Sequence, residues 1–527
     1  METNTARASN TNNLIPASHG LTIYPAPIEE EPATDYRLSV NGQAVVTHRA
    51  RVSAHPVNKV WPGCQRPTSQ TELVSFASWG MTQPVEVSII SQRPVHDVRV
   101  RPTSAGIKPQ VEGDAIRFRI TKPGQFTVEV NGLHHALHLF ANPPEKEIPA
   151  ATNPNVRYFG PGVHCPGVIR LESHQTVYLA AGAVVYGAIL AEKAEHVAIL
   201  GRGILDGSKI DRLDGLTALL CLYDCTSVRI EGITLRDSAV FTLAAVNCRQ
   251  VDMRNIKILG AWRYNSDGID FVNSRHCRVE DCFIRAFDDC IVFKGYEKFG
   301  SFIYPLQLFD NKWDGSFTVD GTTSRTFAAW QRSMGTYACE ADQPISDIQV
   351  RRCVVWNDWG KALEIGIETV VEEIRDILFE DCDLIHVAGV AMDVTTHDRA
   401  WCKNIVFRNI RVELDDDMTR SLCLERNQHG YELLPRDRDS LPYLIRLEVG
   451  TGYCVVDPGR GSIEGVRFQN IAVTSRWMPR SQIHGYDASH LVQRVEIENL
   501  RLNGNMVTDL AAGNFERNEF VKDIVVQ

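Results

Sequence analysis

The chain has 527 residues, 44% of them hydrophobic, which is enough for a large buried core and more chain than one domain usually needs. This composition excludes a disordered or fibrous protein. The net charge of -10 comes from 65 acidic and 55 basic residues without long runs of one sign, so we expect no binding to nucleic acid or to an anionic membrane.

The N-terminal residues 1–10 lack the apolar segment of a signal peptide, and no uninterrupted apolar run approaches the roughly 18 residues of a membrane-spanning helix. We therefore expect a cytoplasmic protein, or a secreted one if the N-terminus is processed. The 14 cysteines form no C-x-x-C pair and fall mostly inside strand-like runs. This placement favours free, buried thiols over disulfides or a zinc site.

The first part of the chain consists of short alternating runs separated by turn residues, as in a β-sandwich. The expected strands cover residues 36–41, 85–90, 97–100, 115–120 and 124–130. Residues 141–150 include two adjacent prolines, which disfavour both a helix and a central strand, so we expect a linker there. We place the boundary near residue 145, between a β-sandwich domain (1–145) and a second domain (146–527). The sequence leaves the role of the sandwich open, and capping an open end of the second domain is one alternative.

Beyond this boundary the sequence repeats a pattern of strand, polar corner and strand. The pattern is clearest at residues 228–235, 251–258 and 277–284, whose starts lie 23 and 26 residues apart. This is about the length of one coil of three short strands with their turns. An Asn or Asp before the second strand suits the bend, because these side chains tolerate the left-handed region. We predict an all-β fold in which a right-handed parallel β-helix solenoid follows the N-terminal β-sandwich domain.

Two stretches interrupt the repeat, residues 296–345 and 415–460, and both are too long for simple turns. Aromatic residues within them include Trp313, Trp330, Tyr337, Tyr431 and Tyr443. Because long loops on one face of a solenoid commonly form its binding wall, we expect these two stretches to line a ligand site.

Four acids occupy two short segments about one repeat apart, residues 265–270 and 287–292. Asp288 follows Asp267 by 21 residues, so on a β-helix the two should project from adjacent coils about 5 Å apart, with Asp289 beside them. Adjacent ionised carboxylates cannot be buried cheaply, so we expect them to line a wet cleft. Hydrolysis of a glycosidic bond needs one protonated carboxyl group and one carboxylate, and crowding of like charges can raise the pKa of one acid enough to keep it protonated.

The sequences Asn265-Ser-Asp-Gly-Ile-Asp and Asp288-Asp-Cys-Ile-Val-Phe-Lys resemble the paired aspartate motifs of glycoside hydrolase family 28, the polygalacturonase-type enzymes. Through the repeats, the resemblance covers roughly residues 155–510. It implies that Asp288 is the general acid, that Asp267 and Asp289 hold and deprotonate the attacking water, and that the anomeric centre is inverted. The implied chemistry uses no metal and no cofactor. Asp270 is expected to shape the bend and is also a candidate substrate contact.

Departures from the polygalacturonase pattern bear on the substrate. Lys361 stands where these enzymes carry the histidine of Gly-His-Gly, and Ala391 and Asp393 replace both basic residues of Arg-Ile-Lys. A uronate carboxylate would lose its cationic partners and be repelled by Asp393, so a neutral oligosaccharide or polysaccharide is favoured. Candidate substrate contacts are Lys361, Glu364, Asp393 and His397. The domain order is similar to that of the dextranase and isopullulanase family, whose own sequence motifs match less well.

Other functions stay open at this point. A polysaccharide lyase on the same solenoid would use a basic residue such as Lys361 to abstract a proton, but the acidic motifs lack an accompanying basic cluster. A sugar transferase would use the same acids with a sugar hydroxyl in place of water. A non-catalytic glycan-binding solenoid would bind without turnover. A homo-oligomer is compatible with each of these functions.

Overall fold

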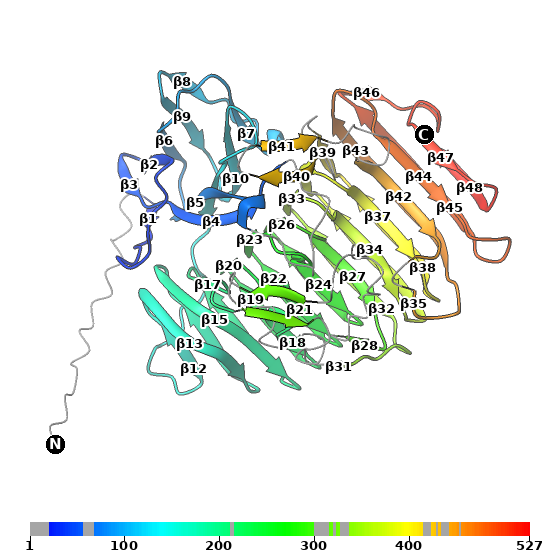
Figure 1. Cartoon of the computed structure of the whole chain (residues 1–527), viewed down its shortest axis with the longest axis horizontal. Helices are drawn as coiled ribbons and strands as arrows, with labels where there is room; N and C mark the ends of the chain where they lie inside the picture. Colours follow the sequence, from blue (N-terminus) through cyan, green and yellow to red (C-terminus); the bar gives the residue numbers. More distant parts are fainter. Residues whose placement is uncertain are drawn as a thin grey trace.

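The computed structural model describes residues 20–55, 68–210, 216–299, 337–414, 442–452 and 455–527. It also gives the backbone of four short strands: β29 (Ser316–Val319), β30 (Thr323–Thr326), β40 (Cys423–Asn427) and β41 (Gly430–Leu433). The described chain is built almost entirely of strands, and one sheet contains 31 of them (Figure 1). The predicted all-β class is confirmed.

Two sheets make up the N-terminal part of the chain. The six-stranded sheet contains β1 (Leu21–Ile23), β4 (His48–Ser53), β5 (Thr71–Met81), β7 (Val98–Arg101), β10 (Gly124–Val130) and β11 (Leu137–Asn142). The five-stranded sheet contains β2 (Tyr36–Val40), β3 (Gln43–Val45), β6 (Val85–Ser91), β8 (Gln110–Glu112) and β9 (Ala115–Ile120). Leu38 and Ile89 of the second sheet share one buried core with Trp79 and Leu139 of the first. Apolar side chains of both sheets therefore meet between them, as in a sandwich.

The remaining strands form parallel columns in which each strand pairs with its counterpart one coil away. The long strands β13 (Gly162–Leu171) and β15 (Ala183–Glu192) start the solenoid. The first column then contains β18 (Ala218–Tyr223), β21 (Phe241–Val246), β24 (Ile269–Val272), β27 (Ile291–Gly295), β34 (Lys361–Thr369), β37 (Val390–Thr396), β42 (Tyr443–Val449), β44 (Arg480–His484) and β47 (Phe515–Arg517).

The second column contains β12 (Val156–Phe159), β14 (Thr176–Leu179), β16 (Ala198–Gly201), β19 (Thr226–Glu231), β22 (Arg249–Arg254), β25 (Arg275–Glu280), β32 (Ile345–Arg351), β35 (Glu373–Glu380), β38 (Trp401–Arg408), β43 (Ser462–Thr474), β45 (Val492–Leu502) and β48 (Val521–Val526). The third column contains β17 (Ile204–Asp206), β20 (Thr234–Arg236), β23 (Lys257–Ala261), β26 (Phe283–Ala286), β33 (Val354–Asn357), β36 (Asp383–Val387) and β39 (Arg411–Glu413). This stack of coils confirms the predicted parallel β-helix, and β11 and β12 lie on either side of the expected boundary at residue 145.

Polar corner residues between the second and third columns allow the chain to turn. Asn409, Asn470 and Asn499 all have φ between 54° and 56°, in the left-handed region that Asn tolerates. Their side chains bond to one another: Asn470 Nδ2 donates to Asn409 Oδ1 at 3.0 Å, and Asn499 Nδ2 donates to Asn470 Oδ1 at 2.8 Å. The bend expected before the second strand of each repeat is therefore reinforced from coil to coil.

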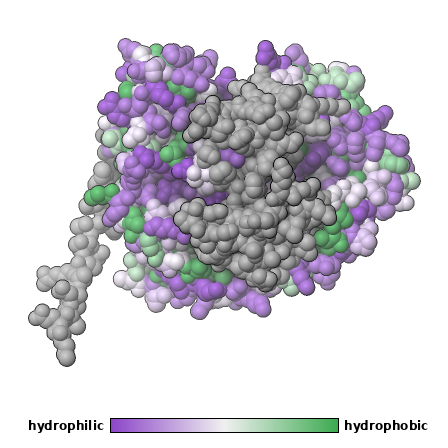
Figure 2. All heavy atoms as spheres, viewed as in Figure 1, coloured by the Kyte–Doolittle hydropathy of each residue, from purple (hydrophilic) through white to green (hydrophobic). Residues whose placement is uncertain are grey.

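Inside the coils, apolar side chains stack on their counterparts one coil away. Phe379 and Phe407 have ring centroids 4.7 Å apart, and Phe407 and Phe468 are 5.1 Å apart, with nearly parallel planes in both pairs. The described cysteines are free and nearly all buried, as expected from their strand positions. Among the described residues, no helix combines the length and the apolar character needed to cross a membrane. The described residues visible in Figure 2 are largely hydrophilic.

The N-terminal sheets pack on the side of the solenoid. Phe76 and Phe140 of the six-stranded sheet share a buried cluster with Phe283, Trp356 and Ile385 of the third column. Figure 1 shows β4 and β5 next to the third-column strands β23, β26 and β33, and β4 contacts β23 directly. The alternative that this domain caps an open end does not fit this packing, because its apolar surface is buried against the side of several successive coils.

Candidate active site

The acids of the two motifs lie at the entry to the first column. Asp267 comes just before β24, and Asp288 and Asp289 come just before β27, the next strand of that column. Backbone bonds hold the two turns together: Gly268 N donates to Asp289 O at 2.8 Å, and Ile269 N donates to Cys290 O at 2.9 Å. A Cβ at Gly268 would lie only 2.3 Å from Cys290 O, so this close approach requires glycine.

The ammonium group of Lys294 lies at the centre of three acids. Its Nζ atom is 2.7 Å from Asp267 Oδ2, 3.3 Å from Asp270 Oδ1 and 3.4 Å from Asp289 Oδ2. Lys294 projects from β27, and the residue two positions before it, Val292, pairs with Asp270 of β24. Because side chains two apart share one face of a strand, the same face carries Asp270 and Lys294. The motifs were expected to lack a basic cluster, and the structure places one lysine of the second motif among three of their acids.

The two adjacent acids Asp288 and Asp289 differ in protonation. For Asp289, burial acts to raise the pKa, but Lys361 and Lys294, with a hydrogen bond from Glu364, lower it to about 2. For Asp288, burial and the like charges of Asp289 and Asp267 hold the pKa well above its usual range. Asp288 is also the more accessible of the pair. The pKa values of the two neighbours are therefore shifted in opposite directions, which makes Asp288 the more readily protonated of the pair.

Asp267 and Asp270 compete for the same cation. Burial raises the pKa of Asp270 to about 7, and Lys294 only partly offsets this effect. Burial and its acidic neighbours also raise the pKa of Asp267, against the attraction of Lys294. Both carboxylate oxygens of Asp270 lack a hydrogen-bond partner, as does Asp267 Oδ1. One ammonium cannot neutralise three acids, so this group retains at least one proton near neutral pH.

A second charged group lies on the following coils of the first column. Glu364 of β34 pairs in register with Asp393 of β37, which pairs with Arg446 of β42. Lys361 forms an ion pair with Glu364, and its Nζ atom is 3.6 Å from Asp393 Oδ2. Arg446 donates to both carboxylate oxygens of Asp393, from Nε to Oδ1 at 3.0 Å and from Nη2 to Oδ2 at 2.5 Å. Thus Lys361, Glu364 and Asp393 adjoin the catalytic candidates, and each cation is already paired with an acid.

His397 lies away from the two charged groups. It follows the end of β37, where its Nε2 atom is 3.8 Å from Glu448 Oε1. Its backbone N–H contacts the carbonyl oxygen of Ile367 at 3.4 Å. The structure therefore places this candidate just after β37, beside Glu448.

Aromatic side chains flank the acids. Trp359 stacks on Phe287 with ring centroids 5.4 Å apart and planes 9° apart, and Tyr264 lies 6.3 Å from Trp359. Trp359 and Tyr264 are both partly exposed, whereas Phe287 is buried. This platform lies beside the turns because Phe287 precedes Asp288 and Tyr264 lies three residues before Asp267.

The aromatic wall expected from the two long loops is mostly outside the described residues. Trp313, Trp330 and the side chain of Tyr431 belong to that undescribed part. Tyr337 packs against Tyr223, with ring centroids 4.4 Å apart, and Tyr443 lies beneath Arg480 at 3.6 Å. Among the described residues, no group of three or more His, Cys, Asp or Glu side chains is arranged to hold a metal ion.

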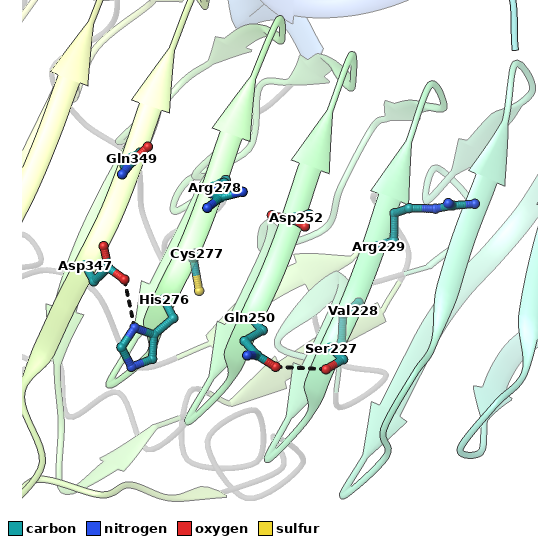
Figure 3. Close-up of a pocket in the computed structure, with 10 residues that line it drawn as sticks. All are labelled: Ser227, Val228, Arg229, Gln250, Asp252, His276, Cys277, Arg278, Asp347 and Gln349. Carbon is teal, nitrogen blue, oxygen red and sulfur yellow. Dashed lines mark hydrogen bonds and ion pairs between the residues drawn. The ribbon is translucent and has the colours of Figure 1, made fainter. Parts of the chain in front are cut away.

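A groove of about 510 Å³ lies over the second column (Figure 3), and none of the acids of the two motifs lines it. It is lined by Ser227, Val228, Arg229, Gln250, Asp252, His276, Cys277, Arg278, Asp347 and Gln349. Polar groups within it bond to one another, with Ser227 Oγ 2.9 Å from Gln250 Oε1 and His276 Nδ1 2.9 Å from Asp347 Oδ2. This groove contains no pair of neighbouring carboxyl groups suited to acid and base catalysis.

Comparison with known proteins finds a family match that contains both acid turns. The sequence model of glycosyl hydrolases family 28 matches residues 206–357, which contain both aspartate motifs. A polygalacturonase from Juniperus ashei is 23% identical over 231 residues, covering 40% of this chain and 45% of the relative. "Probable rhamnogalacturonase A" from Aspergillus oryzae is 20% identical over 292 residues, covering 52% of this chain and 56% of the relative. The chain thus spans about half the length of these curated relatives.

A solved structure matches the whole architecture. Dex49A from Penicillium minioluteum, a dextranase, is similar over 97% of this chain and 99% of its own chain, with a TM-score of 0.61 and 14% identity. At this identity the likeness concerns the fold, and its coverage includes both the β-sandwich and the β-helix. The resemblance to glycoside hydrolase family 28 is confirmed for residues 206–357, and the similarity to the dextranase architecture is confirmed for the fold.

Proposed function

We propose that this protein is an inverting glycoside hydrolase that cleaves O-glycosyl bonds of a neutral polysaccharide or oligosaccharide. The observation that carries the proposal is a pair of adjacent acids in the matched motif whose pKa values shift in opposite directions, raised for Asp288 and lowered to about 2 for Asp289. Glycoside hydrolysis with inversion needs such a pair.

In the proposed reaction, Asp288 gives its proton to the glycosidic oxygen as the bond to the anomeric carbon breaks. A water molecule attacks that carbon from the opposite face and passes a proton to Asp289. Asp267, held by Lys294 at 2.7 Å, orients this water. The proton on Asp289 and the deprotonated Asp288 then exchange with solvent, which restores the starting state.

Charge pairing supports a neutral substrate. Among the described residues of the site, Lys294, Lys361 and Arg446 all pair with acids of the protein. A uronate carboxylate would have to displace one of these acids, whereas a neutral pyranose meets no such cost. Trp359 and Tyr264 offer aromatic surface on which the apolar face of a sugar ring can pack. These features favour a neutral sugar over the galacturonate substrate that the names of the polygalacturonase relatives imply.

A lyase is less well supported. It needs a basic side chain to abstract a proton, and the lysines near the acids are engaged in ion pairs. Transfer to a sugar hydroxyl would use the same acids as hydrolysis, so a transferase is separated from a hydrolase only by its products.

A panel of neutral and acidic oligosaccharides, including dextran fragments and oligogalacturonates, tests the proposal. We expect reducing sugar from a neutral substrate, with the inverted anomer appearing first by proton NMR, and product formation at least about 100-fold slower for Asp288→Asn. Retention of configuration would refute the mechanism. Preferential cleavage of oligogalacturonate would refute the neutral substrate, and ultraviolet absorbance from an unsaturated product would identify a lyase.

A further inference from the structure

We propose that the N-terminal domain positions the catalytic acid through a buried path of three residues, His55, Asp358 and Asn357. This inference rests on the proposed role of Asp288 as the general acid. It gives the domain a part in the reaction although all of its own strands lie outside the acid cluster.

The path begins where the N-terminal domain reaches into the solenoid. His55 follows β4 and is only 2% exposed, and its Nε2 atom lies 3.3 Å from Asp358 Oδ1. Burial lowers the pKa of His55, so the ring is neutral at pH 7. Burial acts to raise the pKa of Asp358, but Arg285 and His55 bring it below its usual value. An ionised Asp358 only accepts hydrogen bonds, so the His55 tautomer that fits donates from Nε2.

Asp358 then connects the segments that lead into two successive turns of the site. It accepts bonds from Arg285 at 3.2 and 3.3 Å and from the indole nitrogen of Trp356 at 2.8 Å. Arg285 precedes Asp288 by three residues, and Asp358 itself precedes Lys361 by three residues. A displacement of Asp358 would therefore shift the turns of both coils, the one with Asp288 and the one with Lys361.

Asn357, the residue next to Asp358 in the chain, bonds directly to the backbone of Asp288. Its Nδ2 atom donates to the carbonyl oxygen of Asp288 at 3.0 Å and to that of Lys361 at 3.4 Å, while its Oδ1 accepts from Gly389 N at 3.3 Å. The side chain is fully buried. Asn357 thus ties the turn of Asp288 to the two following coils.

Gly360 closes the other side of the same turn. A Cβ at this position would lie 2.5 Å from the carbonyl carbon of Asp288 and 2.7 Å from its Oδ1 atom. The general acid is therefore packed against Gly360 and bonded by Asn357, with little room to move. Because misplacement of a reacting group by about 1 Å can cost about 100-fold in rate, this packing matters for catalysis.

The test compares two interface contacts of the N-terminal domain. His55→Ala removes the contact to Asp358, whereas the control Gln125→Ala removes a bond from Gln125 Nε2 to Asn255 Oδ1, which is 2.8 Å long and buried at the same interface. For each full-length variant, we would measure kcat, KM and the pH profile on the best substrate of the panel. Hydrogen exchange of residues 284–291 would be measured by mass spectrometry.

We expect His55→Ala and Asn357→Ala to lower kcat at least about tenfold, with KM within about twofold, and to speed exchange of residues 284–291. Gln125→Ala should leave both quantities at wild-type values even if its melting temperature falls as much. Asn357→Ser, which keeps a smaller polar group, replaces Asn357→Ala if that variant does not fold. Equal behaviour of His55→Ala and Gln125→Ala would overturn the proposal, as would faster exchange with unchanged kcat. Exchange needs no substrate, so failure of the proposed hydrolase activity is seen separately, in the wild-type assay.

Discussion

Replacing Lys294 by methionine should move the low-pH limit of activity upward. Lys294 is the cation shared by Asp267, Asp270 and Asp289, and methionine is a similar unbranched side chain without the terminal ammonium group. The proposed base, Asp289, must be ionised to accept a proton from water. Without the ammonium group, the pKa of Asp289 rises, so the ionised form is lost at a higher pH than in the wild-type protein.

The size of this change follows from the distance between the charges. A unit charge 3.4 Å from the Asp289 oxygen contributes about 5 kcal/mol at an effective dielectric constant of about 20, which corresponds to about 3.5 pH units. Lys361 still lowers the pKa of Asp289 in the variant, and Asp267 and Asp270 take up protons when their cation is lost. We therefore expect a rise of at least about 2 pH units, from a starting pKa of about 2.

The assay is the pH dependence of kcat/KM, which reports the free enzyme. Lys403→Met is the matched control, because Lys403 Nζ bonds Glu373 Oε1 at 2.7 Å in the second column, away from the acids. The low-pH limit should move to about pH 4 or above in Lys294→Met and stay in place in Lys403→Met. An unchanged limit in Lys294→Met would show that this cation does not keep the base ionised, and the electrostatic reasoning would be refuted.

Three further predictions concern single residues. Asp288→Asn should lower kcat by about 100- to 10,000-fold while oligosaccharide affinity, measured by calorimetry, stays within about threefold, because only the transferred proton is lost; a small decrease in kcat would assign the acid elsewhere. The pKa of Asp270 is raised to about 7, so the folded state loses stability as pH rises from about 4 to 7. Asp270→Asn should therefore melt at a higher temperature than the wild-type protein at pH 8 but not at pH 4. Equal melting temperatures of the two proteins at pH 8 and at pH 4 would contradict this. Trp359→Ala should raise KM about tenfold or more and Trp359→Phe much less, because a ring still stacks on Phe287; equal effects would argue against sugar stacking.

Most of the solenoid could be predicted because its signal is repeated along the chain. The strand-corner-strand pattern at residues 228–235 and 251–258 matches β19 with β20 and β22 with β23. Corner residues such as Asn409 adopt the expected left-handed conformation. Several strands of the sandwich were not expected from the sequence, including the long β5. Nearly all positions of β5 are buried or partly buried, so its sequence lacks a clean alternation of apolar and polar residues.

The candidate site could be predicted only in part. Asp267, Asp288 and Asp289 were found because their motifs are local and lie one coil apart. The role of Lys294 as the partner of the acids was missed, although this residue ends the second motif. The two-residue period of a strand could have indicated it, because Lys294 shares a strand face with Val292, which pairs with Asp270. Arg446 lies 53 residues from Asp393, beyond a long interruption of the repeat, so no local pattern links the two.

Because the N-terminal sheets pack on the side of the solenoid, they limit how the number of coils can change. A solenoid ordinarily accepts insertion or deletion of a whole rung, since each rung touches only its neighbours. Here the N-terminal sheets contact the stack from Val184 of β15 to Glu413 of β39, where Arg101 pairs with Glu413 at 2.5 Å. An added rung inside that span would pull its ends out of register with the sheets. Engineering by rung duplication should therefore succeed only past β43, toward the C-terminus.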